Sequence, residues 1–139
     1  MKKIILLFIS CIMLISSCNS VSTSLTDLES STWKLLELNG IKDSTFTVSS
    51  FFTMDFKEGN SLFGIGVCNS FFGKYEAGEN GAITIDMKGS TMAMCPENNL
   101  EQSLSIVLSN IDSFKIKKNK LYLYEGNNNT AIFEKFVKQ

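Results

Sequence analysis

The sequence has no histidine, and its charges almost cancel, with 13 lysines and arginines against 14 acids and a net charge of −1. Histidine is the most common general base, so its absence excludes a Ser-His or Cys-His hydrolase. It also removes the ligand that would complete a usual zinc site built on two cysteines. The acids lie on separate predicted elements, and no basic excess suggests nucleic-acid binding. We therefore expect no enzymatic activity, no metal, no cofactor and no nucleic-acid partner.

The sequence also lacks an apolar run long enough to cross a membrane. Its longest run occupies positions 4–15 and follows the basic pair Lys2-Lys3, whereas a transmembrane helix needs about 20 apolar residues. A basic start, a short apolar stretch and small residues before a cleavage site are typical of a signal peptide. We predict that residues 1–17 are a signal peptide that is removed.

Cys18 ends a stretch, LISSC at positions 14–18, that resembles the lipobox of bacterial lipoproteins. There the cysteine is acylated and becomes the new N-terminus, and two or three acyl chains hold a protein firmly on a membrane. Plain secretion with a chance cysteine is the alternative. An aspartate at the next position favours retention in the inner membrane, so Asn19 favours the outer membrane, with the domain facing the periplasm. We therefore predict lipidation at Cys18, with the membrane as a partner.

Few cysteines remain for the mature domain once the lipid has taken Cys18, because only Cys68 and Cys95 follow it. In an oxidising envelope a disulfide between them is the default. A reactive thiol at Cys95, beside the start of a predicted helix, is the competing interpretation. Residues 18–31 are rich in Ser and Thr without apolar periodicity and predict a flexible tether. Residues 32–139 then form a single domain.

Apolar and polar residues alternate along most of the domain, which is the period of β-strands. One stretch changes to a helical period, with apolar residues from Leu100 to Ile111 on one face, after the only proline, Pro96. The Asn80-Gly81 pair predicts a two-residue type I′ hairpin turn. Together these patterns predict an α+β fold, a mostly antiparallel, small curled sheet or barrel with one flanking helix. The expected strands are residues 33–38, 52–57, 61–65, 72–77, 82–87, 113–117, 121–125 and 130–136, and the expected helix is 96–110.

A set of landmark residues runs through the domain in this order: Trp33, Cys68, Asn69, Gly73, Tyr75, Thr91, Cys95, Glu101 and the Leu121-Tyr122-Leu123 triplet. The order and spacing resemble the META-domain family, also called HslJ-like or DUF306. The chain departs from the family pattern at Val67, where a glycine is usual, and at Ala93-Met94, where the usual order is inverted. The resemblance implies a compact β-rich domain with a flanking helix, in a family linked to heat shock and envelope stress. It implies no established catalytic activity.

Two surface features leave alternatives open. Adjacent phenylalanines at positions 51–52 and 71–72 must face opposite sides of a strand. One of each pair is then covered by the helix, lines a cavity or stays exposed, and the last two outcomes favour an apolar ligand. A lysine cluster is either a solvated or protected strand face or a contact with anionic lipid near the anchor. The cluster consists of Lys115, Lys117, Lys118 and Lys120.

From these observations we expect an envelope lipoprotein without enzymatic activity. Its domain would act in stress tolerance or as an interaction module for an unknown envelope protein. The alternative is a lipid- or apolar-peptide-binding protein that uses a pocket beneath the helix.

Overall fold

The structure is a computed structural model that describes residues 21–39, 41–42, 52–93 and 99–137. Within these ranges the chain forms short strands and two helices, and the first helix has only five residues. The elements are β1 (Val21–Ser22), α1 (Leu25–Glu29), β2 (Thr32–Leu38), β3 (Ile41–Lys42), β4 (Thr53–Lys57), β5 (Ser61–Ile65), β6 (Ser70–Ala77), β7 (Ile83–Ser90), α2 (Asn99–Asn110), β8 (Ser113–Lys117), β9 (Lys120–Glu125) and β10 (Asn128–Phe136).

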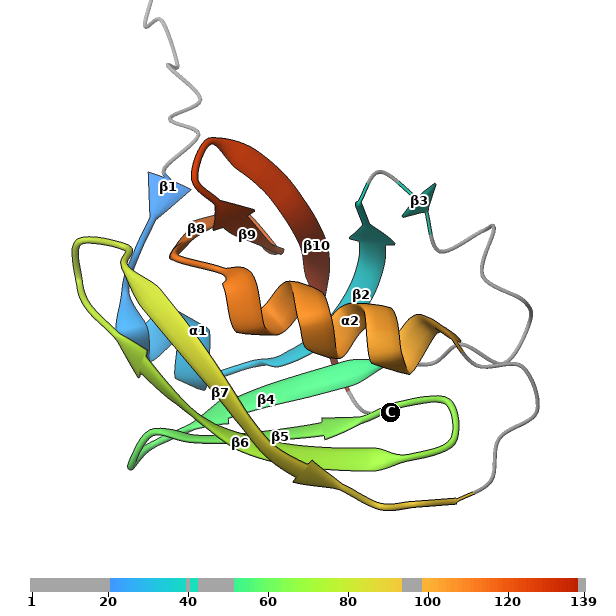
Figure 1. Cartoon of the computed structure of the whole chain (residues 1–139). Helices are drawn as coiled ribbons and strands as arrows, with labels where there is room; N and C mark the ends of the chain where they lie inside the picture. Colours follow the sequence, from blue (N-terminus) through green and yellow to red (C-terminus); the bar gives the residue numbers. More distant parts are fainter. Residues whose placement is uncertain (1–20, 40, 43–51, 94–98, 138–139) are drawn as a thin grey trace, which may run out of the picture.

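All the strands belong to one antiparallel sheet in the order β1-β8-β9-β10-β2-β4-β5-β6-β7, with β3 paired to β2. The sheet curls until its far ends touch at a single bridge between Ala82 and Ser113. Two hydrogen bonds make this contact, from Ile83 N to Asp112 O at 3.0 Å and from Phe114 N to Gly81 O at 2.7 Å. Helix α2 lies in the opening between the β8–β10 half and the β4–β7 half (Figure 1). The predicted fold class is therefore confirmed, as a curled sheet that does not close into a barrel.

Strand alternation places the core on the concave face of the sheet. In β6, for example, Phe71, Gly73 and Tyr75 are buried while their neighbours are exposed, as expected because successive side chains point to opposite faces. Helix α2 adds a stripe with the helical period, in which Leu104, Val107 and Leu108 are buried. The largest fully buried side chains are Trp33, Phe56, Phe114, Phe133, Leu28, Met54, Leu62, Ile83, Leu104, Leu108, Leu121 and Leu123.

Two predicted turns differ from the structure. The hairpin between β6 and β7 forms, but the two-residue type I′ turn was wrong, because that turn needs positive φ at both Asn80 and Gly81. Of these two residues only Gly81 has it, at 83°. Gly81 N instead bonds to Gly78 O and Gly78 N bonds to Ala82 O, which is a three-residue loop with Gly81 in the left-handed position. The turn predicted after β9 is shorter than expected, since β10 already begins at Asn128. The start predicted for the helix, at Pro96, lies outside the described residues.

The tether predicted for residues 18–31 was wrong over its described part. Val21 and Ser22 pair with β8, and the next residues form α1, whose Leu28 is 0% exposed. The Trp33 indole N–H donates to Leu28 O at 2.9 Å, which fixes α1 to β2. The prediction failed because an apolar pattern in a segment this short is too weak to reveal a helix whose stability comes from tertiary contact.

Within the described ranges, no helix has the length and apolar content needed to span a bilayer.

The burial of Leu28 can be tested by substitution. Leu28→Ala should lower the free energy of unfolding by about 2–5 kcal/mol, because it leaves a cavity in a packed core. Urea unfolding of the purified protein measures this, with Thr26→Ala as control at an exposed position of the same helix. An equal, small effect of both substitutions would mean that α1 is not part of the folded domain.

Candidate functional site

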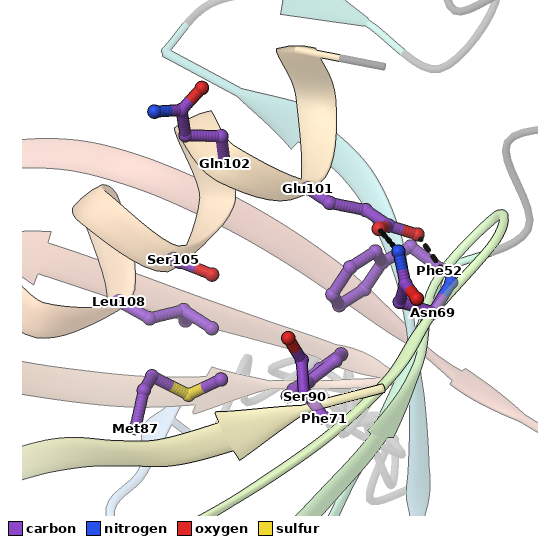
Figure 2. Close-up of a pocket in the computed structure, with 9 residues that line it drawn as sticks. All are labelled: Phe52, Asn69, Phe71, Met87, Ser90, Glu101, Gln102, Ser105 and Leu108. Atoms are coloured by element: carbon purple, nitrogen blue, oxygen red, sulfur yellow. Dashed lines mark hydrogen bonds between the residues drawn. The ribbon is translucent and has the colours of Figure 1, made fainter. Parts of the chain in front are cut away.

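Glu101, in the first turn of α2, reaches down to the connection between β5 and β6 (Figure 2). One carboxylate oxygen, Oε1, accepts hydrogen bonds from the backbone amides of Cys68 at 2.9 Å and Asn69 at 3.0 Å. The other, Oε2, accepts from the Asn69 side-chain amide at 3.0 Å. Successive backbone N–H groups that converge on one point form an anion-binding nest. In this protein the anion is a side chain of the same chain.

Asn69 extends these contacts to the end of β7. Its Oδ1 accepts from the Thr91 hydroxyl at 3.0 Å and from the amide of Ala93 at 2.8 Å. The Thr91 hydroxyl oxygen in turn accepts from Ser70 N at 3.0 Å. A hydroxyl can donate one hydrogen bond and accept another at the same time, so all the hydrogen bonds of this series are compatible. We call these contacts the Glu101–Asn69–Thr91 network; it joins α2, the β5–β6 connection and β7.

Gly66 makes room for the network. A Cβ atom at this position would lie 2.3 Å from Glu101 Oε1 and 2.9 Å from Asn69 O, both closer than atoms can approach. The bare backbone is therefore needed at Gly66, one residue before Val67. The departure from the family pattern at Val67 thus leaves the network intact.

The network holds Glu101 in its charged form. Burial alone would raise the pKa of Glu101, but hydrogen bonds from Asn69, Cys68 and Val67 outweigh burial, and the pKa lies below its usual value. Hydrogen bonds to the ionised form of a carboxylate always act in this direction. Glu101 is therefore ionised at neutral pH and its oxygens are already occupied, which suits a structural anchor better than a proton-transfer group.

A pocket of about 260 Å³ lies beside the network, between α2 and the sheet (Figure 2). Its floor includes the stacked rings of Phe52 and Phe71, whose centroids are 4.8 Å apart. The lining is mixed, with four apolar side chains (Phe52, Phe71, Met87 and Leu108) among polar ones. The lining residues are Phe52, Asn69, Phe71, Met87, Ser90, Glu101, Gln102, Ser105 and Leu108.

The other predicted motif residues lie elsewhere. Trp33 is in the core. A Cβ on Gly73 would lie 2.5 Å from Asp86 O, so Gly73 permits close pairing of β6 with β7 at a bulge. Tyr75 donates its hydroxyl to the Glu29 carboxylate. Burial, and then this carboxylate, raise the pKa of Tyr75. The structure thus brings the side chains of Asn69, Thr91 and Glu101 together, with the backbone amide of Cys68, whereas Trp33, Gly73 and Tyr75 lie elsewhere.

Sequence reasoning missed Glu29 altogether, because it lies in the segment predicted as tether. The available signal was the short spacing from Ser24 to Asp27, in which the Ser24 side chain caps α1 by accepting from Asp27 N. This is the usual signature of a helix start. Cys18 and Cys95 lie outside the described residues, so lipidation and the disulfide with Cys68 stay predictions.

The convex face of the sheet carries an exposed apolar group that we call the β5–β6 patch: Phe63, Ile65 and Phe72. These side chains are 53%, 52% and 50% exposed, and Phe63 and Phe72 are direct cross-strand neighbours. The neighbouring Phe71 is buried and lines the pocket. As predicted, the pair at 71–72 is divided between the two faces. Phe51 of the other pair lies outside the described residues.

Substituting Glu101 tests the network. Glu101→Gln should lower stability at neutral pH by about 1–3 kcal/mol, because the amide is a weaker acceptor and places a donor against donors. The folded-state pKa of Glu101 lies below the unfolded one, so its contribution is complete above the unfolded pKa and is lost as pH falls through the folded pKa. The difference between wild type and variant should therefore shrink on acidification.

Urea unfolding from neutral pH to roughly pH 3, below the usual glutamate range, measures this. The matched control is Glu76→Gln, at an exposed position of β6, which should change stability little at any pH. A Glu101 effect that is independent of pH would contradict the role of its charge.

Comparison with known proteins concerns the family and the fold of the chain. A model of the META domain matches residues 26–137. Among solved structures, a DUF4847 family protein from Bacteroides vulgatus is similar, with a TM-score of 0.64 at 15% identity over 84% of this chain and 99% of that one. A protein solved by NMR has a TM-score of 0.55 at 23% identity, over 78% and 91% of the two chains. These likenesses concern the fold alone.

No curated protein matches the sequence significantly. The family model, however, covers most of the chain, from α1 to the end of the described residues, and it includes the whole Glu101–Asn69–Thr91 network. The chain therefore belongs to the META-domain family.

Proposed function

We propose that this META-domain protein is a lipid-anchored interaction module of the bacterial cell envelope, without enzymatic activity, that acts in stress tolerance. The anchor rests on the lipobox-like sequence that ends at Cys18. The role in stress tolerance rests on the family resemblance. The structure contributes one observation that favours contact with another molecule, the exposed β5–β6 patch.

The β5–β6 patch carries the proposal. Phe63 and Phe72 are paired directly across two strands, and Ile65 lies two positions along on the same face of β5. Large apolar side chains that stay about half exposed and adjacent on a rigid sheet are typical of contact surfaces. Gly89 pairs with Phe72 on the next strand, and a Cβ there would lie 2.8 Å from the Phe72 ring. The Phe72 ring thus extends over Gly89 of β7, which broadens the patch.

The polar network supports a structural rather than a catalytic role for the motif residues. Both oxygens of Glu101 are used by the β5–β6 connection, and Asn69 and Thr91 bond to each other and to nearby backbone. Residues committed to one another in this way position α2 on the sheet. They offer little to a substrate.

A second candidate function is binding of a small apolar molecule in the pocket beneath α2. The observation that favours it is the apolar part of the lining, from Phe52, Phe71, Met87 and Leu108. At about 260 Å³, the pocket lies just below the range of roughly 300–1,000 Å³ that is usual for ligand sites. Mass spectrometry of an organic extract of the purified protein distinguishes the two, because a stoichiometric apolar compound would favour binding in the pocket.

Photo-crosslinking tests the β5–β6 patch. A crosslinking amino acid placed at Phe63 or at Phe72 should capture the same envelope protein in living cells. Substituting the other phenylalanine by Ser should strongly reduce that adduct, because it removes one of the two aromatic side chains of the patch. The same probe at Asp86, an exposed position of β7, is the control and should not give the adduct. Adducts that are equal at all three positions, or absent from all, would contradict the proposed contact.

Metabolic labelling tests the anchor. Cells that express the wild-type chain with radioactive palmitate should yield labelled protein, and Cys18→Ala should remove the label, because the acylated thiol is missing. Intact-mass analysis of native protein should show an acylated N-terminus at Cys18. An unmodified amino end, or a leader still attached, would overturn the anchor.

A further inference from the structure

The described chain begins close to the proposed anchor. Val21 in β1 pairs with Lys117 in β8, and only two residues separate Val21 from Cys18. An extended chain spans at most about 3.6 Å per residue, so three steps place the Cα atoms of Cys18 and Val21 within about 11 Å. A lipid on Cys18 would therefore hold the β1–β8 edge directly at the membrane surface. A flexible tether of 14 residues would have left the orientation of the domain free.

The residues beside this point are the lysine cluster. Lys115 and Lys117 alternate with buried residues along β8 and point outward. Lys120 is the direct cross-strand partner of Lys117, and Lys118 forms the turn between them, where its φ is 56°. All four lysines are exposed, and Figure 1 shows β1 alongside the β8–β9 hairpin that carries them.

The positive charge of the cluster is compensated only in part within the described part of the chain. The salt bridges found there join Lys57 to Asp55 and Lys88 to Asp86, and neither involves the cluster. The acidic residue opposite in strand register is Glu134, across from Lys120. Like charges that face each other across a strand pair destabilise it. Repulsion between Lys117 and Lys120 thus destabilises the hairpin locally, and a bound anion would reduce this repulsion.

The same outward face carries residues suited to a membrane interface. Tyr122 is the cross-strand partner of Lys115, and the Lys115 ammonium lies 5.3 Å from the centre of the Tyr124 ring. Both tyrosines are partly exposed. Val21, 54% exposed, shares the face of Lys117 because the two are paired. Tyrosine rings and long lysine side chains are enriched where a protein meets the headgroup layer.

We propose that the outward face of the β8–β9 hairpin, defined by Lys115, Lys117, Lys118, Lys120, Tyr122 and Tyr124, docks on anionic phospholipid headgroups beside the anchor. The proposal rests on the proposed acylation of Cys18. Anionic lipid attracts clustered lysines close to a membrane surface. The full chain has a net charge of −1, and Lys2 and Lys3 precede the predicted cleavage site, so the remainder of the mature chain is acidic. The domain would therefore be attracted to the surface on this side and repelled elsewhere.

Chemical labelling of the native lipoprotein in vesicles tests the docking. The acylated protein is reconstituted into vesicles of phosphatidylcholine alone, or of equal parts phosphatidylcholine and phosphatidylglycerol, and its lysines are acetylated briefly and quantified by mass spectrometry. Labelling at Lys115, Lys117, Lys118 and Lys120 should fall several-fold on the anionic vesicles. It should recover at high salt, because salt screens exposed charges. Lys74, exposed on β6, is the internal control and should not change.

A charge variant adds a second readout. In Lys117→Gln/Lys118→Gln/Lys120→Gln, protection of Lys115 on anionic vesicles should be lost although the protein stays anchored. Equal labelling of the cluster on both kinds of vesicle overturns the docking alone, provided that the protein floats with neutral vesicles and carries the acylated mass. Failure to float with neutral vesicles overturns the anchor and, with it, this inference.

Discussion

The arrangement of this domain depends on the hydrogen bonds that the Glu101 carboxylate accepts from the backbone amides of the β5–β6 connection. Helix α2 packs on the sheet through apolar side chains, which are attractive but not directional. The bonds from Glu101 to Cys68 and Asn69 add the direction, because hydrogen bonds to a charged acceptor require a defined geometry. They fix where the helix begins relative to the sheet. The pocket lies beneath the helix held in this way, in the opening of a sheet that does not close (Figure 1).

Because the polar motif residues are used within the domain, we propose that contact with other molecules is made by its outer surface. Two outward faces differ in chemistry: the β5–β6 patch is apolar, and the β8–β9 hairpin is basic. They lie on strands well separated in the sheet order. A domain held to a membrane through the basic face would leave the apolar one available to a partner. The anchor, the docking and the partner contact are thus compatible proposals on one small domain.

Much of the fold could be predicted from the sequence, because strand and helix periods are local properties. Strands such as β5 and β8 were placed with their observed bounds, and α2 ends at Asn110 as expected. The failures were at short elements. A helix of five residues is unstable alone, and α1 persists because Leu28 is buried and bonded to Trp33. The type of turn predicted at Asn80-Gly81 was wrong because an Asn-Gly dipeptide fits hairpin loops of two or of three residues, and the local sequence does not distinguish them.

The sequence by itself determined the fold class, the order of strands along the chain and, through the resemblance, which residues belong to the motif. Only the tertiary structure decided which of these residues meet. Asn69, Thr91 and Glu101 are brought together although Trp33, Gly73 and Tyr75 belong to the same motif, and Val21 lies beside Lys117 although 96 positions separate them. The physical reason is that strand pairing and helix packing join residues through space. Sequence periodicity specifies which face a side chain occupies, but not which distant side chain it faces.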